Sequence, residues 1–394
     1  METQIQDRVT HRIGFTATQW QMIIAMSAAI GLRMLGLFLV LPVFTLYGQQ
    51  FTDSKFLIGL AFGGYGLTMA MVQYPFGRLS DRYGRKKILI IGMLLFSAGA
   101  ILAAIPASIE WLIAARLLQG LGGITSVSFA LIADVVEEKR RSTAMAFLGI
   151  PIGLSFAVGV LLGPVLASLW GYASLFWITG VGGLLSALHI TLVVKEPQRH
   201  NRPSETHGTL GRDILKLNTC GFVMNFFMTA FFFYFPLMVG QYLSLRQYYV
   251  ALGPMVFVAG ISMFVASRIA DKGAGKLVSF LSFCILLFSS LFVFQHDQGF
   301  LSAHPLAWMI FGGILFFMGF SGLEPVLPAL VSRFSPREVY GASLGSFNTI
   351  QYLGSFAGSA LAGYLGHFSR SYVMAVLALA AALGMLMISR LHAH

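Results

Sequence analysis

The sequence contains little charge and little cysteine. Of its 394 residues, 10% are charged and 57% are hydrophobic, whereas about a quarter of the residues of a typical soluble domain are charged. A chain this poor in charge cannot cover its surface with polar groups in water, so we expect a lipid bilayer to surround it. Its two cysteines, Cys220 and Cys284, fall within long apolar runs. We interpret both as buried small hydrophobic residues and predict neither a disulfide nor a metal site.

The sequence also lacks motifs of catalysis and cofactor binding. It has no phosphate-binding glycine loop, no Ser-His-Asp order and no pair of histidines at metal-ligand spacing. His189 stands alone in an apolar run, and we interpret it as a packed polar group. We therefore predict that the chain is not an enzyme and needs no cofactor. An ion gradient, rather than a nucleotide, is the expected source of energy.

Long apolar runs fill the rest of the chain. A membrane-crossing helix needs about 20 apolar residues, whereas a strand of a membrane barrel alternates in polarity over about ten. The runs here are long and apolar on every face, so they predict an all-α membrane protein with twelve transmembrane helices. The predicted spans are 19–47, 55–77, 88–106, 110–133, 142–168, 172–194, 217–241, 247–267, 277–295, 305–331, 339–365 and 370–389.

Positive charge is distributed unevenly among the segments between these spans. The net charge is +11. With the amino terminus placed inside, 21 of the 26 lysines and arginines fall in inward segments, and Lys55, Arg246 and Arg370 fall outside. The positive-inside rule then predicts that both termini are cytoplasmic. Nucleic-acid binding is not expected, because no soluble basic domain remains to perform it.

The spans divide into two groups of six. Residues 1–18 are polar and predict a cytoplasmic tail rather than a cleavable signal, and no soluble domain is expected after the last span. Residues 195–216 contain Pro197, Pro203 and Gly208 and predict a cytoplasmic linker. The predicted bundles are therefore 19–194 and 217–394.

A charged segment recurs once in each half. The first charged segment, residues 77–87, reads Gly-Arg-Leu-Ser-Asp-Arg-Tyr-Gly-Arg-Lys-Lys, and the second, residues 267–276, is a weaker copy. Each lies between the second and third spans of its half. Two halves repeated in the same orientation are typical of secondary transporters whose halves move against each other.

Several motifs resemble those of a known family. The first charged segment resembles the loop signature of the major facilitator superfamily, and residues 116–120 (Arg-Leu-Leu-Gln-Gly) are similar to its second signature. Residues 32–43 and 324–328 further resemble its bacterial YajR-like branch. The fifth span carries a pattern similar to that of the drug/proton antiporters, formed by Gly149, Gly153, Gly159, Gly163 and Pro164. The resemblance covers essentially the whole chain and implies the major facilitator fold; the glycine pattern alone also fits simple helix packing.

The first charged segment is a candidate conformational latch. Gly77 would let two helices approach closely, and Asp81 would cap the following helix and accept bonds from Arg85. The resemblance implies that Asp81 faces the amino end of the eleventh helix and that Arg85 pairs with Asp134, with Arg82 beside them. The latch would hold the outward-facing state and break when the inside opens. The alternative is that these charges only enforce topology.

Three charges fall within spans, where ionisable groups are costly and indicate function. Glu324 is the candidate proton carrier, because apolar surroundings favour its neutral form and allow it to take up and release a proton; a static structural bond is the alternative. Arg33 would bind an anionic part of a substrate or tune the carboxylate. Arg116 would bond backbone carbonyls near the first helix, as the resemblance implies, in a structural or a proton-linked role.

The resemblance also implies a central substrate cavity. Aromatic and amide side chains on the helices that would line it are its candidate contacts. These are Tyr65, Gln119, Asn225, Phe231, Tyr234, Asn348, Gln351 and Tyr352.

The predicted function is export of a small amphipathic organic compound or drug by proton antiport through alternating access. The first alternative is a proton-coupled importer of an organic solute or a siderophore. An alternative of another class is a non-transporting membrane scaffold or a membrane enzyme. The expected partners are the lipid bilayer, protons and a small organic substrate, and the expected oligomeric state is a monomer.

Overall fold

The computed structural model describes residues 14–196, 211–294, 304–336 and 339–392, and every regular element among them is a helix. Ten helical segments are long and apolar enough to cross a membrane. One of them, Leu245–Val293, joins two helices at a tight turn, and a further 29-residue helix, Tyr340–Phe368, completes the set. The described chain therefore makes the twelve predicted passes.

The N-terminal half consists of long helices joined by short connections. Its helices are α2 (Ala17–Val40), α3 (Phe44–Gly48), α4 (Lys55–Tyr83), α5 (Arg85–Ala104), α6 (Ile109–Gly120), α7 (Thr125–Val135), α8 (Glu138–Trp170) and α9 (Tyr172–Val193). Thr16 and Gln19 form a capping box that starts α2. Gly84, with φ 101°, ends α4 and lets α5 begin at the next residue, because glycine adopts positive φ without steric cost.

The C-terminal half repeats this arrangement. Its elements are α10 (Arg212–Val239), η1 (Leu245–Gln247), α11 (Tyr248–Ile269), η2 (Ala270–Ala274), α12 (Gly275–Phe294), α13 (Pro305–Phe334), α14 (Tyr340–Phe368) and α15 (Arg370–Ser389). The second charged segment is a π-helical turn with Gly273 at φ 93°. α10 begins at Arg212, inside the predicted linker; residues 197–210 lie outside the described residues, as do 1–13 of the predicted tail.

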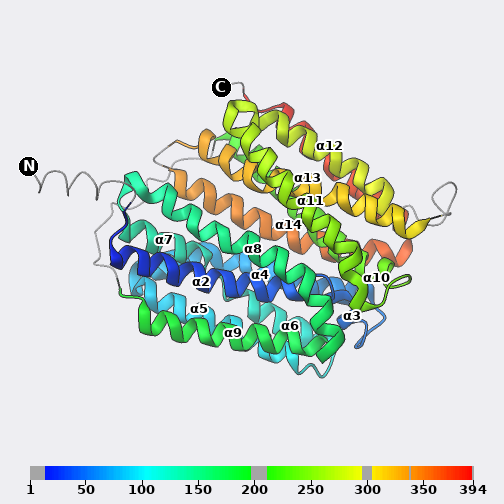
Figure 1. Ribbon diagram of the computed structural model, residues 1–394, viewed down its shortest axis with the longest axis horizontal. Helices are drawn as coiled ribbons and strands as arrows, with labels where there is room; N and C mark the ends of the chain where they lie inside the picture. The colour runs from blue at the N-terminus through cyan, green and yellow to red at the C-terminus, as the bar shows by residue number, and fades with distance from the viewer. Residues whose placement is uncertain (1–13, 197–210, 295–303, 337–338, 393–394) are drawn as a thin grey trace, which may run out of the picture.

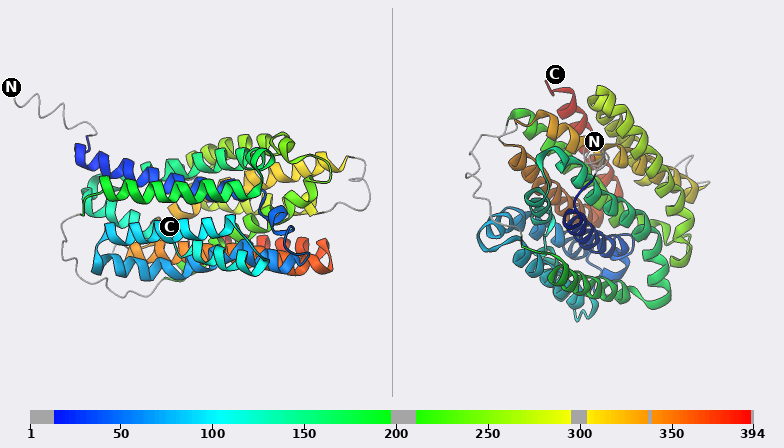
Figure 2. Two further views of the ribbon diagram at one scale, coloured as in Figure 1. Left: turned by 90° about the horizontal axis from the view of Figure 1, so that it is seen from below. Right: turned by 60° about the vertical axis from the view of Figure 1, so that its left-hand side comes forward.

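The two halves lie side by side as two bundles with nearly parallel helices (Figure 1), and Figure 2 shows the same arrangement from below and nearly end-on. We call one end of the bundle the basic end. It contains the end of α4, the beginnings of α5 and α12, and the residues Asp213 and Arg390. The other, called the opposite end, contains Lys55, Ser108 and Arg370. Successive helices run between these ends in alternating directions.

Two of the predicted spans contain a break in the helix that the sequence analysis did not foresee. The span 19–47 stops at Val40 and resumes at Phe44, and the span 110–133 stops at Gly120 and resumes at Thr125. Pro42 cannot donate a backbone hydrogen bond, which explains the first break. At the second, Gly122 lies against Phe96, so close that a side chain there would collide with it. The first break lies near the opposite end and the second at mid-span, and apolar composition conceals both in the sequence.

At the opposite end the two halves pack backbone against backbone. On α4, Gly59 and Gly63 leave no room for a side chain, because α14 contributes Ser359 and Phe356 at the same level. Such close approach of helices is the usual role of glycine in membrane proteins. Lys55 Nζ adds a hydrogen bond of 3.0 Å to the carbonyl oxygen of Gly366. No such approach is present at Gly77, since no atom lies within 4 Å of where its Cβ would be; its close approach in the outward-facing state stays a prediction.

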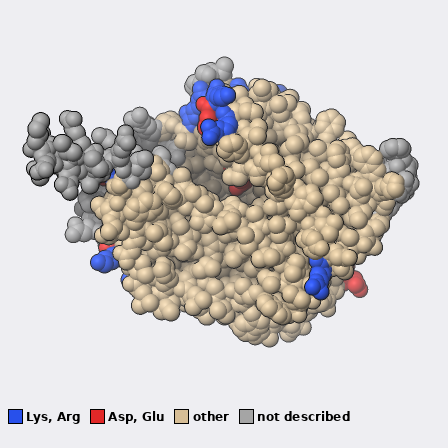
Figure 3. Space-filling view, in the orientation of Figure 1, with Lys and Arg blue, Asp and Glu red and all other residues tan. Residues whose placement is uncertain are grey.

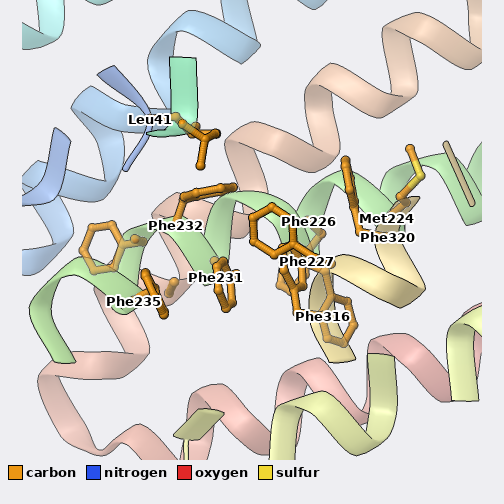
Figure 4. Packing of buried hydrophobic residues seen from close by; sticks show 14 of the residues in the cluster. Leu41, Met224, Phe226, Phe227, Phe231, Phe232, Phe235, Phe316 and Phe320 are labelled. Atoms are coloured by element: carbon orange, nitrogen blue, oxygen red, sulfur yellow. The ribbon is translucent and has the colours of Figure 1, made fainter. Parts of the chain in front are cut away.

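Aromatic rings extend this interface. Phe231 stacks on Phe316 with ring centroids 4.1 Å apart, and Phe156 of α8 meets Phe317 of α13 at 5.8 Å. Figure 4 shows Leu41 of the N-terminal half above Phe232 of α10, next to the other rings. One hydrophobic cluster thus includes buried residues of both halves.

At the basic end, the glycines of α4 and α14 do not show comparable close packing between the halves. Gly345 of α14, like Gly77 of α4, has no neighbouring atom where a side chain would begin. Figure 3 shows a hollow in the face bordered by α8 and α11, with an acidic side chain inside it. The structure is therefore closed at the opposite end and open toward the basic end.

Candidate functional site

A buried arginine occupies the middle of the N-terminal half. Arg33 of α2 is 0% exposed. Its NH1 donates to the Thr125 hydroxyl at 3.2 Å, and its NH2 donates to the Tyr65 hydroxyl and lies 3.1 Å from Met69 Sδ. Its Nε has no hydrogen-bond partner among the described residues. Neutral groups therefore surround this charge.

A second buried arginine lies on the other side of the same tyrosine. Arg116 of α6 is 4% exposed and donates to Gln119 Oε1 at 2.5 Å. Its guanidinium carbon is 5.1 Å from the ring centre of Tyr65, and that of Arg33 is 5.9 Å from it. The predicted bond from Arg116 to backbone carbonyls was wrong: the bond observed goes to the side chain one helical turn ahead.

Neither arginine forms an ion pair within the part of the chain that the structure describes. The break between α6 and α7 brings the carboxyl end of one helix and the amino end of another to the same level. α7 begins at Thr125, so the free N–H groups of its first turn lie at mid-depth beside Arg33. The centre of the N-terminal half is thus strongly electropositive.

A carboxylate faces this region from the C-terminal half. Glu324 lies deep within the molecule on α13, yet its side chain is exposed, and it forms no hydrogen bond or ion pair with any described residue. Tyr352 of α14 is close enough to interact electrostatically with both Glu324 and Arg33, and also lies beside Thr125. Tyr352 therefore lies between Glu324 of the C-terminal half and Arg33 of the N-terminal half.

Two prolines follow Glu324 within α13. Pro325 and Pro328 lie inside the helix, which continues to Phe334. Because proline has no N–H, the carbonyl groups four residues earlier, at Ser321 and Glu324, lose their helical donors. The backbone hydrogen bonds of α13 are therefore fewer at the level of Glu324.

The eight predicted cavity residues separate into two groups. Half of them are partly exposed, namely Asn225, Asn348, Gln351 and Tyr352, and half are buried, namely Tyr65, Gln119, Phe231 and Tyr234. Phe231 is enclosed by its ring stack, and the Tyr234 hydroxyl donates to the carbonyl oxygen of Ala362 at 3.0 Å. In this conformation these two do not line the hollow. Aromatic composition alone could not reveal that their faces turn toward other helices.

The predicted latch residues meet within one half. Arg85 contacts Asp81 at 2.5 Å, Asp134 at 3.0 Å and the Ser80 hydroxyl at 2.5 Å, while Arg82 lies over the ring of Tyr83. These contacts join α4, α5 and α7, which all belong to the N-terminal half. The pair of Arg85 with Asp134 is thus intact in a structure open at the basic end, where Asp81 is 63% exposed. The expectation that Asp81 faces the amino end of α14 in the outward-facing state, and that this contact breaks when the inside opens, stays a prediction.

Glu196 was missed by the sequence analysis. Its two carboxylate oxygens accept bonds from the backbone N–H groups of Arg85 and Lys86, at 2.6 and 2.9 Å. It therefore caps α5, the role predicted for Asp81, whose carboxylate instead pairs with the Arg85 side chain. The separation of 111 residues between Glu196 and Arg85 leaves no local signal for this contact.

The fold and the central site define a two-bundle membrane transporter. The chain belongs to the Major Facilitator Superfamily, whose family model matches residues 26–359. It is 33% identical over 352 residues to the inner membrane transport protein YajR of Escherichia coli (strain K12), covering 86% of this chain and 76% of the relative. It is 27% identical to multidrug resistance protein 2 of Bacillus subtilis (strain 168), covering 84% and 85%. The relatives are transporters, so the prediction that this chain is not an enzyme is confirmed.

Solved structures share the fold. A bacterial homologue of the human lysosomal transporter Spinster, in an inward-facing and occupied conformation, superposes with a TM-score of 0.74 at 15% identity over 95% of this chain and 94% of its own. The human organic anion transporter MFSD10 (TETRAN) gives a TM-score of 0.66 at 16% identity, covering 94% and 99%. The predicted twelve-helix major facilitator fold is confirmed. The chain is a multi-pass membrane protein that carries a small molecule across a lipid bilayer.

Proposed function

We propose that the chain is a proton-coupled secondary transporter for a small amphipathic organic solute, with Glu324 as the proton carrier. The observation that carries this proposal is the position of Glu324: deep in the bundle, exposed, and without a partner among the described residues. A carboxylate that no residue holds in one ionisation state can be protonated from one side and deprotonated on the other. A static structural acid would have a fixed donor.

The proposed pathway alternates between the two ends. The hollow is open toward the basic end, and the α4–α14 glycine contacts close the opposite end. The charge distribution supports the basic end as the cytoplasmic face in a bacterial inner membrane. Because the two halves of one chain together supply the acid and both arginines, we propose that a monomer is sufficient.

Export in exchange for protons is the first candidate direction. It is supported by relatives that are named multidrug resistance proteins. Proton cotransport into the cell is the second candidate, and a specific observation favours it: Arg33 and Arg116 have no carboxylate partner among the residues described. An anionic solute could supply their missing counter-charge, as the name of the neighbour MFSD10, an organic anion transporter, also suggests.

Everted membrane vesicles acidified inside test this proposal. An exchanger should dissipate the pH gradient when ethidium or naphthoate is added outside, whereas a cotransporter should dissipate it only when naphthoate is loaded inside. Glu324→Gln should abolish either response while leaving the amount of folded protein unchanged. Glu110→Gln makes the same substitution at an exposed first-turn position of α6 and should behave as the unmodified protein. A normal response from Glu324→Gln would show that Glu324 is structural.

A further inference from the structure

The two buried arginines require a counter-charge that the described chain does not provide. Both guanidinium groups are nearly inaccessible, and both Nε atoms lack a hydrogen-bond partner. A buried cation without an anion is costly, since desolvation is not repaid by an ion pair. Residues kept at such a cost within a membrane usually contact a substrate or an ion pathway.

The donors around Arg33 converge on one place. The Arg33 guanidinium, whose Nε has no partner among the described residues, donates to the Thr125 hydroxyl at the helix break, where the first N–H groups of α7 also lie. The Tyr352 side chain lies next to Arg33 and Thr125 and is itself partly exposed. Movement of this ring would therefore remove one of the side chains that lie between Arg33 and Glu324.

We infer that the transported solute is an organic carboxylate, whose anionic group takes the place of the Tyr352 hydroxyl at Arg33 and Thr125. A carboxylate accepts two parallel bonds from a guanidinium, and here it would also receive the N–H groups that start α7. Arg116, on the far side of the Tyr65 ring, supplies a second positive charge at longer range. The inference rests on the transport function proposed above and names its substrate class.

The site also bears on the direction of transport. Tyr352 lies within electrostatic range of both Arg33 and Glu324, so a bound carboxylate and an ionised Glu324 would repel each other. The anion therefore binds best when Glu324 is neutral, and by linkage the bound anion favours protonation of Glu324. Anion and proton then move together, which supports cotransport over exchange.

Thermal unfolding of the purified full-length protein tests this inference with three probes of one shape: 2-naphthoate, its amide and the corresponding amine. Because a ligand of the folded state raises the melting temperature, naphthoate should raise it in a concentration-dependent manner and the other two should not. Equal stabilisation by the amide, or stabilisation by the amine alone, would overturn the inference.

Two arginine variants locate the site. Arg33→Gln should weaken naphthoate binding by about 30-fold, because one charged partner of a buried pair is lost. Arg78→Gln, at an exposed arginine stacked on Tyr74 with 4.4 Å between guanidinium carbon and ring centre, should bind naphthoate normally. Unchanged binding by Arg33→Gln would contradict the inference.

Two further variants keep the test decisive if Arg33→Gln fails to fold. Tyr352→Phe removes the hydroxyl that competes for Arg33 and should bind naphthoate more tightly; unchanged or weaker binding would refute the proposed position. Glu324→Gln removes a repelling charge and should bind naphthoate at least as well as the unmodified protein. Loss of binding there would overturn the anion site, whereas normal proton coupling by the same variant would overturn only the proposed role of Glu324.

Discussion

The two ends of the bundle are held together by different kinds of contact. At the opposite end, glycines of α4 meet the backbone of α14, and aromatic rings of both halves share one cluster. At the basic end, the ion pairs described join helices of the same half: the Arg85 cluster joins α4, α5 and α7. Apolar contacts therefore join the two halves, whereas charges keep each half rigid where the halves separate.

The C-terminal half shows the same use of charge. Asp213 of α10 pairs with Lys216 at 2.8 Å and with His392 at 2.7 Å, and Lys216 also donates to the carbonyl oxygen of Arg390. Lys276 of α12 donates to the carbonyl oxygen of Leu391 at 2.6 Å. These contacts fasten the end of α15 to its own half. The positive charges that set topology thus also bind helix ends within each bundle.

The largest effect is expected at the interface between the halves. Gly63→Leu places a side chain where Ser359 and Phe356 already lie, so the opposite end should open and transport should be lost. Labelling of a cysteine introduced by Ser355→Cys, in a protein lacking Cys220 and Cys284, should rise from the opposite side.

Gly77→Leu is the matched control, because the space beside Gly77 is empty. It should leave labelling from the opposite side nearly unchanged, because Gly77 lies at the other end of α4. If Gly77→Leu opens the opposite end as much as Gly63→Leu does, the interface does not depend on close approach of α4 and α14, and the comparison between the two ends fails.

A smaller effect is expected in the Arg85 cluster. Arg85→Gln removes the bonds to Asp81 and Asp134 and should lower the free energy of unfolding by about 2 kcal/mol. Because the cluster lies within one half, labelling at the opposite end should stay unchanged. Arg78→Gln should alter stability by less than about 0.5 kcal/mol. Thermal or denaturant unfolding in detergent measures both; a shift in labelling with Arg85→Gln would show that the cluster acts between the halves.

The smallest effect is expected at the cap of α5. Glu196→Ala leaves the N–H groups of Arg85 and Lys86 without their acceptor and should destabilise the protein by about 1 kcal/mol. Glu137→Ala serves as the control, because Glu137 precedes α8 without forming a capping bond through its side chain. Equal melting temperatures for the two variants would indicate that Glu196 contributes nothing as a cap.

Part of the candidate site could be predicted from the sequence, and part could not. The family motif predicted the pairing of Arg85 with Asp134. The rarity of charge in apolar runs singled out Arg33, Arg116 and Glu324. The position of Tyr352 between Glu324 and Arg33 required the packing of α14 against the N-terminal half. The burial of Phe231 and Tyr234 also required it, because a helix that is apolar on every face has no periodicity to indicate its orientation.

Twelve membrane crossings in two similar halves with one basic end could be predicted from the sequence alone, because the bilayer sets the length of the spans and the placement of lysine and arginine. Packing in three dimensions was needed to show which glycines join the halves, that Glu196 caps α5, and that Tyr352 lies between Glu324 and Arg33. These features depend on contacts between helices far apart in the chain, and hydropathy does not distinguish a surface that faces lipid from one that faces another helix.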